Sequence, residues 1–485
     1  MAVRSDILKA PGDRWWLQIV APAGWLGTAA VAFGTGIGAA AVATQFQRGA
    51  PLVLIALFVA PLLAIAILIN PLIAILVVLA TFPIGSIAQS VGPLRIQAVE
   101  VAIFVAAMVV VLRRLAVGKI PLPFAGPLGW AIALFLWTLI SLFSAIDETL
   151  ALKVLFSLLG GIVCATVVLA VCESSRDVRI LLGGFVTSGC AIGLITFSET
   201  KHLSGAAASF GGSQVITGRL QGAFDSPNQL GSLTALMIPV TAGLIFGART
   251  TRWRVTAGLA LVILLVTLML SLSRGAWVGA GVALLFLLMK LREARRLLTV
   301  LAIPLVIVGF FVWSLAPTKT DVRVVGERAR AITVLSPYDD RRVIYKEAIR
   351  EIKEDPLLGV GPGGFPVAST RIVSESATLS YAHAHNLYLN WAAETGLPSL
   401  VIILGFAFAL GFAARTASRG AQIRGDPRDR AIILGIGAAL LTVLVQGAFD
   451  YVIPNPVVFA AFWTLVGALL VLRREALALS RPGTT

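Results

Sequence analysis

Apolar positions along this chain come in long unbroken runs, not in the short alternating or 3.6-residue patterns of water-soluble elements. Each run of about 20 residues is long enough to cross a hydrocarbon layer of about 30 Å. The pattern therefore predicts an all-α, polytopic transmembrane protein with about 12–14 spans. The lower number applies because the pairs of spans at 51–92 and 255–290 are tight hairpins that could each count as fewer crossings. The predicted spans are 20–46, 51–69, 71–92, 96–112, 127–146, 150–172, 180–198, 228–248, 255–272, 275–290, 297–316, 386–413, 431–449 and 457–472.

Composition supports this interpretation and excludes one alternative. Of 485 residues, 58% are hydrophobic and only 13% are charged, whereas a soluble domain has about 25% charged residues. The net charge of +15 might indicate a nucleic-acid-binding protein. The basic residues, however, lie in short clusters between apolar runs, as orientation signals do. We therefore expect membrane lipids, and not nucleic acid, around the chain.

The distribution of basic residues predicts the orientation. With the N-terminus placed inside, 23 of the 39 Lys and Arg residues fall in cytoplasmic segments and 6 in short external ones. The remaining 10 lie in the long segment 317–384, and long loops are exempt from the positive-inside rule. Both termini are predicted to be cytoplasmic. The first run, 20–46, is too long for the core of a signal peptide and is predicted to be an uncleaved span.

Three regions follow from this topology: transmembrane helices over 1–316 with an external segment at 199–227, an external loop at 317–384, and C-terminal transmembrane helices over 385–485. The external loop has 10 basic and 9 acidic residues, which indicates a folded, water-facing piece. Within it, 339–354 has the spacing of an amphipathic helix. Asp355-Pro356 should end that helix, and the glycines of 359–364 predict a turn with no helix pattern after it.

Several basic residues could bind an anion on the external side. Arg274 lies at the external end of a span, where the orientation bias disfavours it, so it is either a fixed cation facing a phosphate or carboxylate or an interfacial arginine that snorkels. Arg341 and Arg342 open the amphipathic helix, either as anion ligands or as a solvated pair with the preceding aspartates. Arg219 lies just before a predicted helix start, at a membrane-surface entrance.

Two of the three histidines lie together before the predicted span 386–413. His385 could act as a base near neutral pH or serve as an interfacial polar cap, with His383 beside it. The third histidine, His202, is too distant in spacing to form a metal motif, so no metal and no cofactor is expected. Glu394 lies inside the same predicted span, and a buried carboxylate there needs a partner or a proton.

No nucleotide-binding loop or serine-hydrolase motif is convincing in the sequence. An external active site would therefore need a donor that already carries its activation, such as a lipid diphosphate.

Five sequence pieces, in order, resemble the O-antigen ligase and O-antigen polymerase family of bacterial inner membranes. The pieces are Gly218-Arg219-Leu220 with Pro227-Asn228, Ser273-Arg274-Gly275-Ala276, Asp340-Arg341 with Tyr345, Asp355-Pro356-Leu357-Leu358-Gly359-Val360-Gly361, and His385-Asn386-Leu387-Tyr388 with Glu394 and Gly396. They cover 219–396. The family often has Trp at the position of Tyr345.

The resemblance implies a glycosyltransferase that uses an undecaprenyl-diphosphate-linked glycan at the periplasmic face of the bacterial inner membrane. Arginines matching Arg274 and Arg341 would bind the diphosphate, and the histidine matching His385 would help to activate the acceptor hydroxyl. Guanidinium groups could neutralise the leaving diphosphate without a metal, and attack opposite it would invert the anomeric centre. Further substrate-binding residues expected around these three are Arg219, Arg342, His383, Tyr345, Asn386 and Glu394.

The acceptor would be lipid A–core in a ligase or a growing glycan in a polymerase, and the sequence leaves both open. A flippase or exporter of lipid-linked sugars is the alternative from another class, although transporters are expected to show charges along mid-membrane positions and often repeat symmetry. A structural membrane partner of a polysaccharide complex is a third interpretation.

Overall fold

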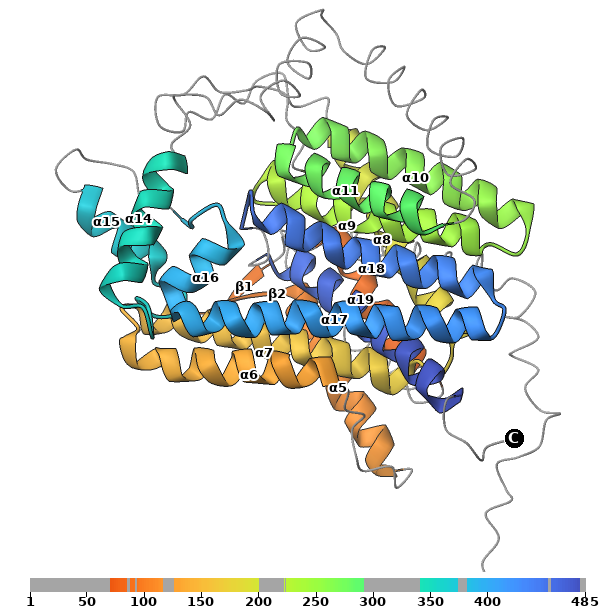
Figure 1. Cartoon of the computed structure of the whole chain (residues 1–485), viewed down its shortest axis with the longest axis horizontal. Helices are drawn as coiled ribbons and strands as arrows, with labels where there is room; N and C mark the ends of the chain where they lie inside the picture. The colour runs from red at the N-terminus through yellow and green to blue at the C-terminus, as the bar shows by residue number, and fades with distance from the viewer. Residues whose placement is uncertain are drawn as a thin grey trace, which may run out of the picture.

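A computed structural model describes residues 70–84, 88–91, 94–116, 126–199, 222, 224–291, 341–373, 382–451 and 455–479 of the protein. This part of the chain is nearly all helical (Figure 1). The elements before the external loop are α4 (Leu72–Ala80), η2 (Phe82–Ile84), β1 (Ala88–Val91), β2 (Leu94–Gln97), α5 (Ala98–Ala116), α6 (Gly126–Ile140), η3 (Ser141–Ser144), α7 (Glu148–Val171), α8 (Ser175–Glu199), α9 (Pro227–Gly247), α10 (Thr251–Ser271) and α11 (Arg274–Lys290). Those that follow are α14 (Arg341–Glu354), α15 (Phe365–Val373), α16 (Leu387–Thr395), α17 (Leu397–Ile423), α18 (Pro427–Gly447) and α19 (Pro456–Leu479).

The predicted all-α, multi-span fold is confirmed. Eight helices of the described residues are long and apolar enough to cross a membrane, and the shorter apolar stretch Leu72–Ile84 adds to them. The predicted spans 96–112, 127–146, 150–172, 180–198, 228–248, 255–272, 275–290, 431–449 and 457–472 coincide with helix over most of their length. The predicted spans 20–46, 51–69 and 297–316 lie outside the described residues.

Two predicted spans differ from the structure. The span predicted at 71–92 ends as helix at Ile84, and β1 then pairs antiparallel with β2, Ala88 opposite Gln97. The span predicted at 386–413 is divided into α16 and α17 at Gly396, whose φ of 77° is left-handed. A glycine in this conformation ends a helix, and Pro398 lies in the first turn of the next one, where proline is favoured. Hydrophobic run length alone could not show this break.

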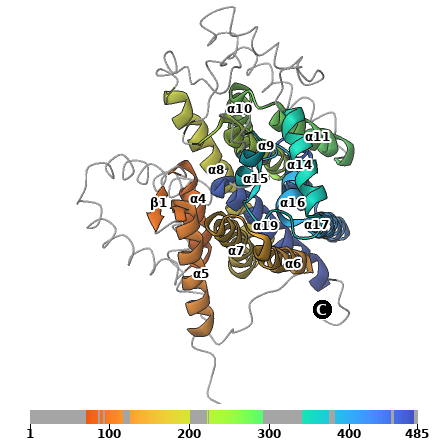
Figure 2. The ribbon, with the colours of Figure 1, turned by 90° about the vertical axis from the view of Figure 1, so that its left-hand side faces the viewer.

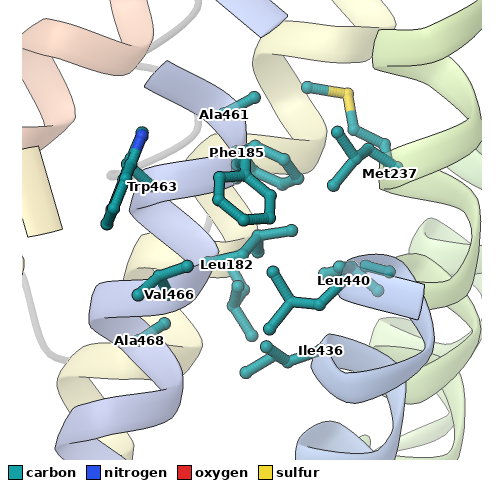
Figure 3. Close-up of a cluster of buried hydrophobic side chains, with 14 of the residues drawn as sticks. Leu182, Phe185, Met237, Ile436, Leu440, Ala461, Trp463, Val466 and Ala468 are labelled. Carbon is teal, nitrogen blue, oxygen red and sulfur yellow. The ribbon is translucent and has the colours of Figure 1, made fainter. Parts of the chain in front are cut away.

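The long helices lie roughly along one direction, side by side, with α9 and α19 at the centre (Figure 1). In these two helices, 94% of the most apolar window is buried, compared with 28% in α17 and 33% in α6. Side chains from α8, α9, α18 and α19 meet in the interior, where Phe185, Met237 and Leu440 are packed together (Figure 3). The apolar side chains that α17 leaves exposed are those that lipid would cover.

The described part of the predicted external loop lies against one end of this bundle, where α14, α15 and α16 lie together (Figures 1 and 2). The predicted amphipathic helix is confirmed as α14, which buries Ile344 and Ala348 against Phe365 of α15 and Ala393 of α16. The turn predicted over 359–364 is present, with three glycines at positive φ. The helix α15 that follows the turn was missed because its nine residues are too few for a clear periodic pattern.

Candidate active site

A histidine and an aspartate from different loops meet at the end of the bundle where α14 and α16 lie. His385 Nδ1 lies 3.0 Å from Asp450 Oδ1, and the imidazole remains about one third exposed while the carboxylate is buried. Burial alone would raise the pKa of Asp450, but the hydrogen bond with His385 and the nearby imidazoles outweigh it, so this pKa lies below its usual range. The ionised carboxylate therefore accepts the Nδ1–H of His385, which leaves Nε2 free to accept a proton.

The backbone around His385 is held in an unusual conformation. His385 has a φ of 47°, in the left-handed region that residues other than glycine seldom adopt. Tyr345 on α14 donates its hydroxyl hydrogen to the His385 carbonyl at 3.4 Å. Asn386 caps α16 by accepting the N–H groups of Tyr388 and Leu389, and donates to the Ala448 carbonyl. Tyr345 and Asn386, predicted as substrate-binding residues, thus position the histidine loop in the structure.

His383 lies beside His385 with a ring-centroid separation of 4.2 Å. Its Nδ1 accepts the backbone N–H of His385, so its own proton is on Nε2. Burial, with the charges of His385 and Arg341, lowers its pKa to about 4. His383 is therefore neutral near pH 7, and it offers a substrate an N–H donor, not a positive charge.

Arg274 is the first residue of α11, at a sharp break between two helices. Leu272, with a φ of 52°, ends α10 in the left-handed conformation, and the extended Ser273 precedes the new helix. Trp277 closes the break by donating its indole N–H to the Leu268 carbonyl at 3.0 Å. The next residue, Gly275, lies against Phe449, the neighbour of Asp450. The structure thus brings the start of α11, with its half-buried arginine, to the same end of α18 as the His385–Asp450 pair.

The two arginines of α14 have different surroundings. Arg341 begins the helix and is half-buried, and it lies close enough for its charge to lower the pKa of His383. Arg342 lies on the exposed side of α14, away from the buried face. The structure therefore brings Arg341 to the histidines and leaves Arg342 facing solvent. Arg219, a further predicted ligand, lies outside the described residues.

Glu394 is buried, and its surroundings explain how a carboxylate is tolerated there. Its Oε2 accepts the backbone N–H of Gly363 at 3.0 Å, which ties α16 to the glycine turn. Burial raises its pKa to about 7. The same turn is held by the Val360 N–H on the Ala393 carbonyl and by the Leu397 N–H on the Pro356 carbonyl. In this arrangement Glu394 fixes the turn behind the site.

Asp450 was not singled out in the sequence. Its position could have been noted, because it directly follows the predicted span 431–449 on the external side, just as His385 directly precedes another span. Its partner is 65 residues away in the chain, and no local spacing joins the two.

A divalent ion could also use these side chains. Ligand atoms of His383, His385 and Asp450 all lie within 4.8 Å of one another. The group has the nitrogen and carboxylate donors of a metal site. The guanidinium charge of Arg341, which acts on His383, opposes a second cation there. A hydrogen-bonded His–Asp pair fits these surroundings better.

Comparison with known proteins confirms the resemblance over the part of the chain that holds most of this site. Residues 259–404 match the family model described as O-antigen ligase. This segment includes Arg274, Arg341 and His385, whereas Asp450 lies beyond it. The match supports a membrane glycosyltransferase of the ligase or polymerase type, acting on a lipid-linked glycan and an acceptor.

No curated protein matches the chain. Among solved structures, one described as "Structural coordination of polymerization and crosslinking by a peptidoglycan synthase complex" is similar, with 17% sequence identity and a TM-score of 0.41, covering 72% of this chain and 97% of that one. Likeness at this level does not extend to function.

Proposed function

We propose that the protein transfers a glycan from an undecaprenyl-diphosphate carrier to an acceptor hydroxyl at the external face of the bacterial inner membrane, as an O-antigen ligase. The observation that carries this proposal is the His385–Asp450 pair, placed beside the ends of α11 and α14 where Arg274 and Arg341 lie. A base and two fixed cations at a membrane surface suit a reaction between a hydroxyl and a lipid-borne diphosphate.

In the proposed reaction, the acceptor oxygen attacks the anomeric carbon as the bond from that carbon to the diphosphate oxygen breaks. His385 Nε2 takes the hydroxyl proton, while Nδ1–H remains bonded to Asp450, which stabilises the imidazolium. Attack opposite the leaving group inverts the anomeric configuration, and retention in the product would contradict this step.

Arg274 and Arg341 would stabilise the leaving diphosphate. A guanidinium makes forked, charge-assisted hydrogen bonds to phosphate oxygens, and it keeps its charge at all physiological pH values. Both arginines begin helices, where the backbone N–H groups add to the positive potential. Their two helices reach the site from the bundle and from the external loop, so the lipid can remain in the bilayer while its glycan extends into water.

The test is transfer by the purified full chain given an undecaprenyl-diphosphate glycan and lipid A–core. We expect Arg274→Ala, Arg341→Ala and His385→Ala each to abolish transfer while leaving membrane insertion intact. Arg342→Ala is the matched control, because this neighbouring arginine faces solvent. Full activity in all three site variants would refute the assignment.

The product distinguishes the remaining alternatives. A single transfer to lipid A–core indicates a ligase, and a ladder of glycan lengths indicates a polymerase. Movement of the intact lipid-linked glycan across a vesicle membrane, without transfer, would indicate a transporter. Loss of activity on chelation, restored by a divalent ion, would replace the proposed base with a metal at His383, His385 and Asp450.

A further inference from the structure

An apolar cavity of about 640 Å³ lies between α17, α18 and α19, and its lining includes Leu387, two residues after His385. Its lining on α17 extends from Ile403 to Arg419, which is about 24 Å along a helix that rises ~1.5 Å per residue. Aromatic side chains of α19 also line the cavity, Phe462 and Trp463 among them. This length and lining suit a hydrocarbon chain.

The two ends of the cavity differ in charge. Four basic side chains line one end: Lys290, Arg415, Arg419 and Arg430. At the opposite end, toward the external loop, the lining is formed by Leu387 and Trp391. A lipid in this cavity would therefore place an anionic headgroup at the basic end, which is the predicted cytoplasmic end.

The four cations have no acidic partner among the described residues. The acidic groups of this end are already engaged: Asp429 pairs with Arg179 and Arg424, and Glu475 pairs with Arg424. Positive residues at a cytoplasmic end also serve orientation. That role does not require four cations around one cavity that all lack an acidic partner in the described part of the chain.

Arg430 supplies an independent observation. Its Nε is buried and has no hydrogen-bond partner, although the side chain lines the cavity. A buried donor without a partner is costly, which points to a ligand that supplies an acceptor oxygen.

We propose that this cavity binds an anionic phospholipid of the cytoplasmic leaflet, with its phosphate on Arg415, Arg419 and Arg430 and an acyl chain along α17 and α19. Basic pockets between transmembrane helices on this side of a membrane bind anionic headgroups by the same chemistry. The donor's polyprenyl chain is the less suitable occupant, because a lipid with its diphosphate at the external end would place its hydrocarbon tail at Arg415, Arg419 and Arg430 and leave these cations without an acceptor oxygen.

Native mass spectrometry of the detergent-purified full chain tests this directly. The protein is offered equimolar phosphatidylglycerol, phosphatidylethanolamine and undecaprenyl phosphate. We expect a phosphatidylglycerol adduct on the wild type. The adduct should fall by about tenfold or more in Arg415→Gln/Arg419→Gln/Arg430→Gln. The matched control, Arg249→Gln/Arg252→Gln/Arg254→Gln, removes three arginines around another predicted cytoplasmic end and should retain the adduct.

A second variant fills the cavity without touching a charge. Gly411 lines the cavity, and a Cβ added there meets no atom within 4 Å. Gly411→Phe should therefore leave the fold intact and displace the phospholipid. Equal losses in the control triple variant, retention of the adduct in Gly411→Phe, or preferential binding of undecaprenyl phosphate would each overturn the proposal. These readouts do not depend on glycan transfer, so they are independent of the proposed enzymatic function.

Discussion

Asp450 acts on the site through a single hydrogen bond to His385. Asp450→Asn removes the negative charge that holds the Nδ1 proton and stabilises the imidazolium. We expect kcat for glycan transfer to fall by about 10²–10⁴-fold, the range that a positioned base contributes. Substrate affinity should change little, because the carboxylate is buried behind the imidazole.

The control for this substitution is Asp426→Asn at the opposite end of α18. Asp426 caps that helix, and asparagine caps a helix about as well. Unchanged kcat in Asp450→Asn, or an equal loss in Asp426→Asn, would show that Asp450 has no specific role in transfer.

Among single residues, Glu394 also makes the stability of the protein depend on pH in a predictable direction. Its pKa in the folded chain is about 7, above the ordinary 4.5. The folded state therefore holds a proton that the unfolded chain releases, and this contribution to stability is present below pH ~4.5 and lost as the pH rises through ~7. Glutamine at this position is neutral at every pH and can still accept the Gly363 N–H.

Thermal unfolding in detergent at pH 5 and pH 8 measures this effect. The drop in Tm from pH 5 to pH 8 should be smaller in Glu394→Gln than in the wild type. Glu173→Gln, at an exposed position between α7 and α8, should keep the wild-type drop. An identical drop in all three proteins would contradict a protonated Glu394.

At the scale of elements, the junction between α16 and α17 depends on Gly396. A Cβ added there would lie 1.8 Å from the Leu357 carbonyl oxygen, and the φ of 77° strains any other residue. Gly396→Ala should lower Tm in detergent, because the strained conformation alone costs about 1–3 kcal/mol. The glycine turn would also lose its close contact with α16.

Gly258→Ala is the matched control for the junction. Gly258 lies inside α10, and a Cβ there meets no atom within 4 Å. Alanine in a helix interior is favoured over glycine by roughly 0.5–1 kcal/mol, so Tm should stay the same or rise. A Gly396→Ala protein as stable as this control would mean that the turn and the junction do not depend on close backbone approach.

Some of these elements could be predicted from the sequence and others could not. The described spans between 96 and 290 and the helix α14 were predicted, because apolar length and helical periodicity are local properties of the chain. The break at Gly396 and the short helix α15 were not predicted, since a long apolar run conceals the first and nine residues are too few to reveal the second.

For the whole molecule, the orientation predicted from basic residues can be tested with a membrane-impermeant thiol reagent in intact cells. Arg350→Cys on α14 should be labelled from outside, because its side chain is about half exposed. Ile423→Cys, at the other end of α17 and 83% exposed, should react only after the membrane is permeabilised.

The unmodified chain is the background for this labelling. Cys164 and Cys172 are buried and Cys190 is partly buried, so little labelling is expected without an introduced cysteine. Labelling of Ile423→Cys in intact cells would reverse the predicted orientation, and with it the external placement of His385.

The sequence by itself determined the membrane class, most of the span positions, a predicted orientation, and the set that includes Arg274, Arg341 and His385. Apolar length, charge bias and short motifs record these properties locally. Only the tertiary structure decided that Asp450 is the partner of His385 from 65 residues away, that Glu394 fixes the glycine turn, and that four cations surround one cavity. These features depend on how helices pack, because contacts between distant segments are set by the whole fold and leave no spacing in the chain.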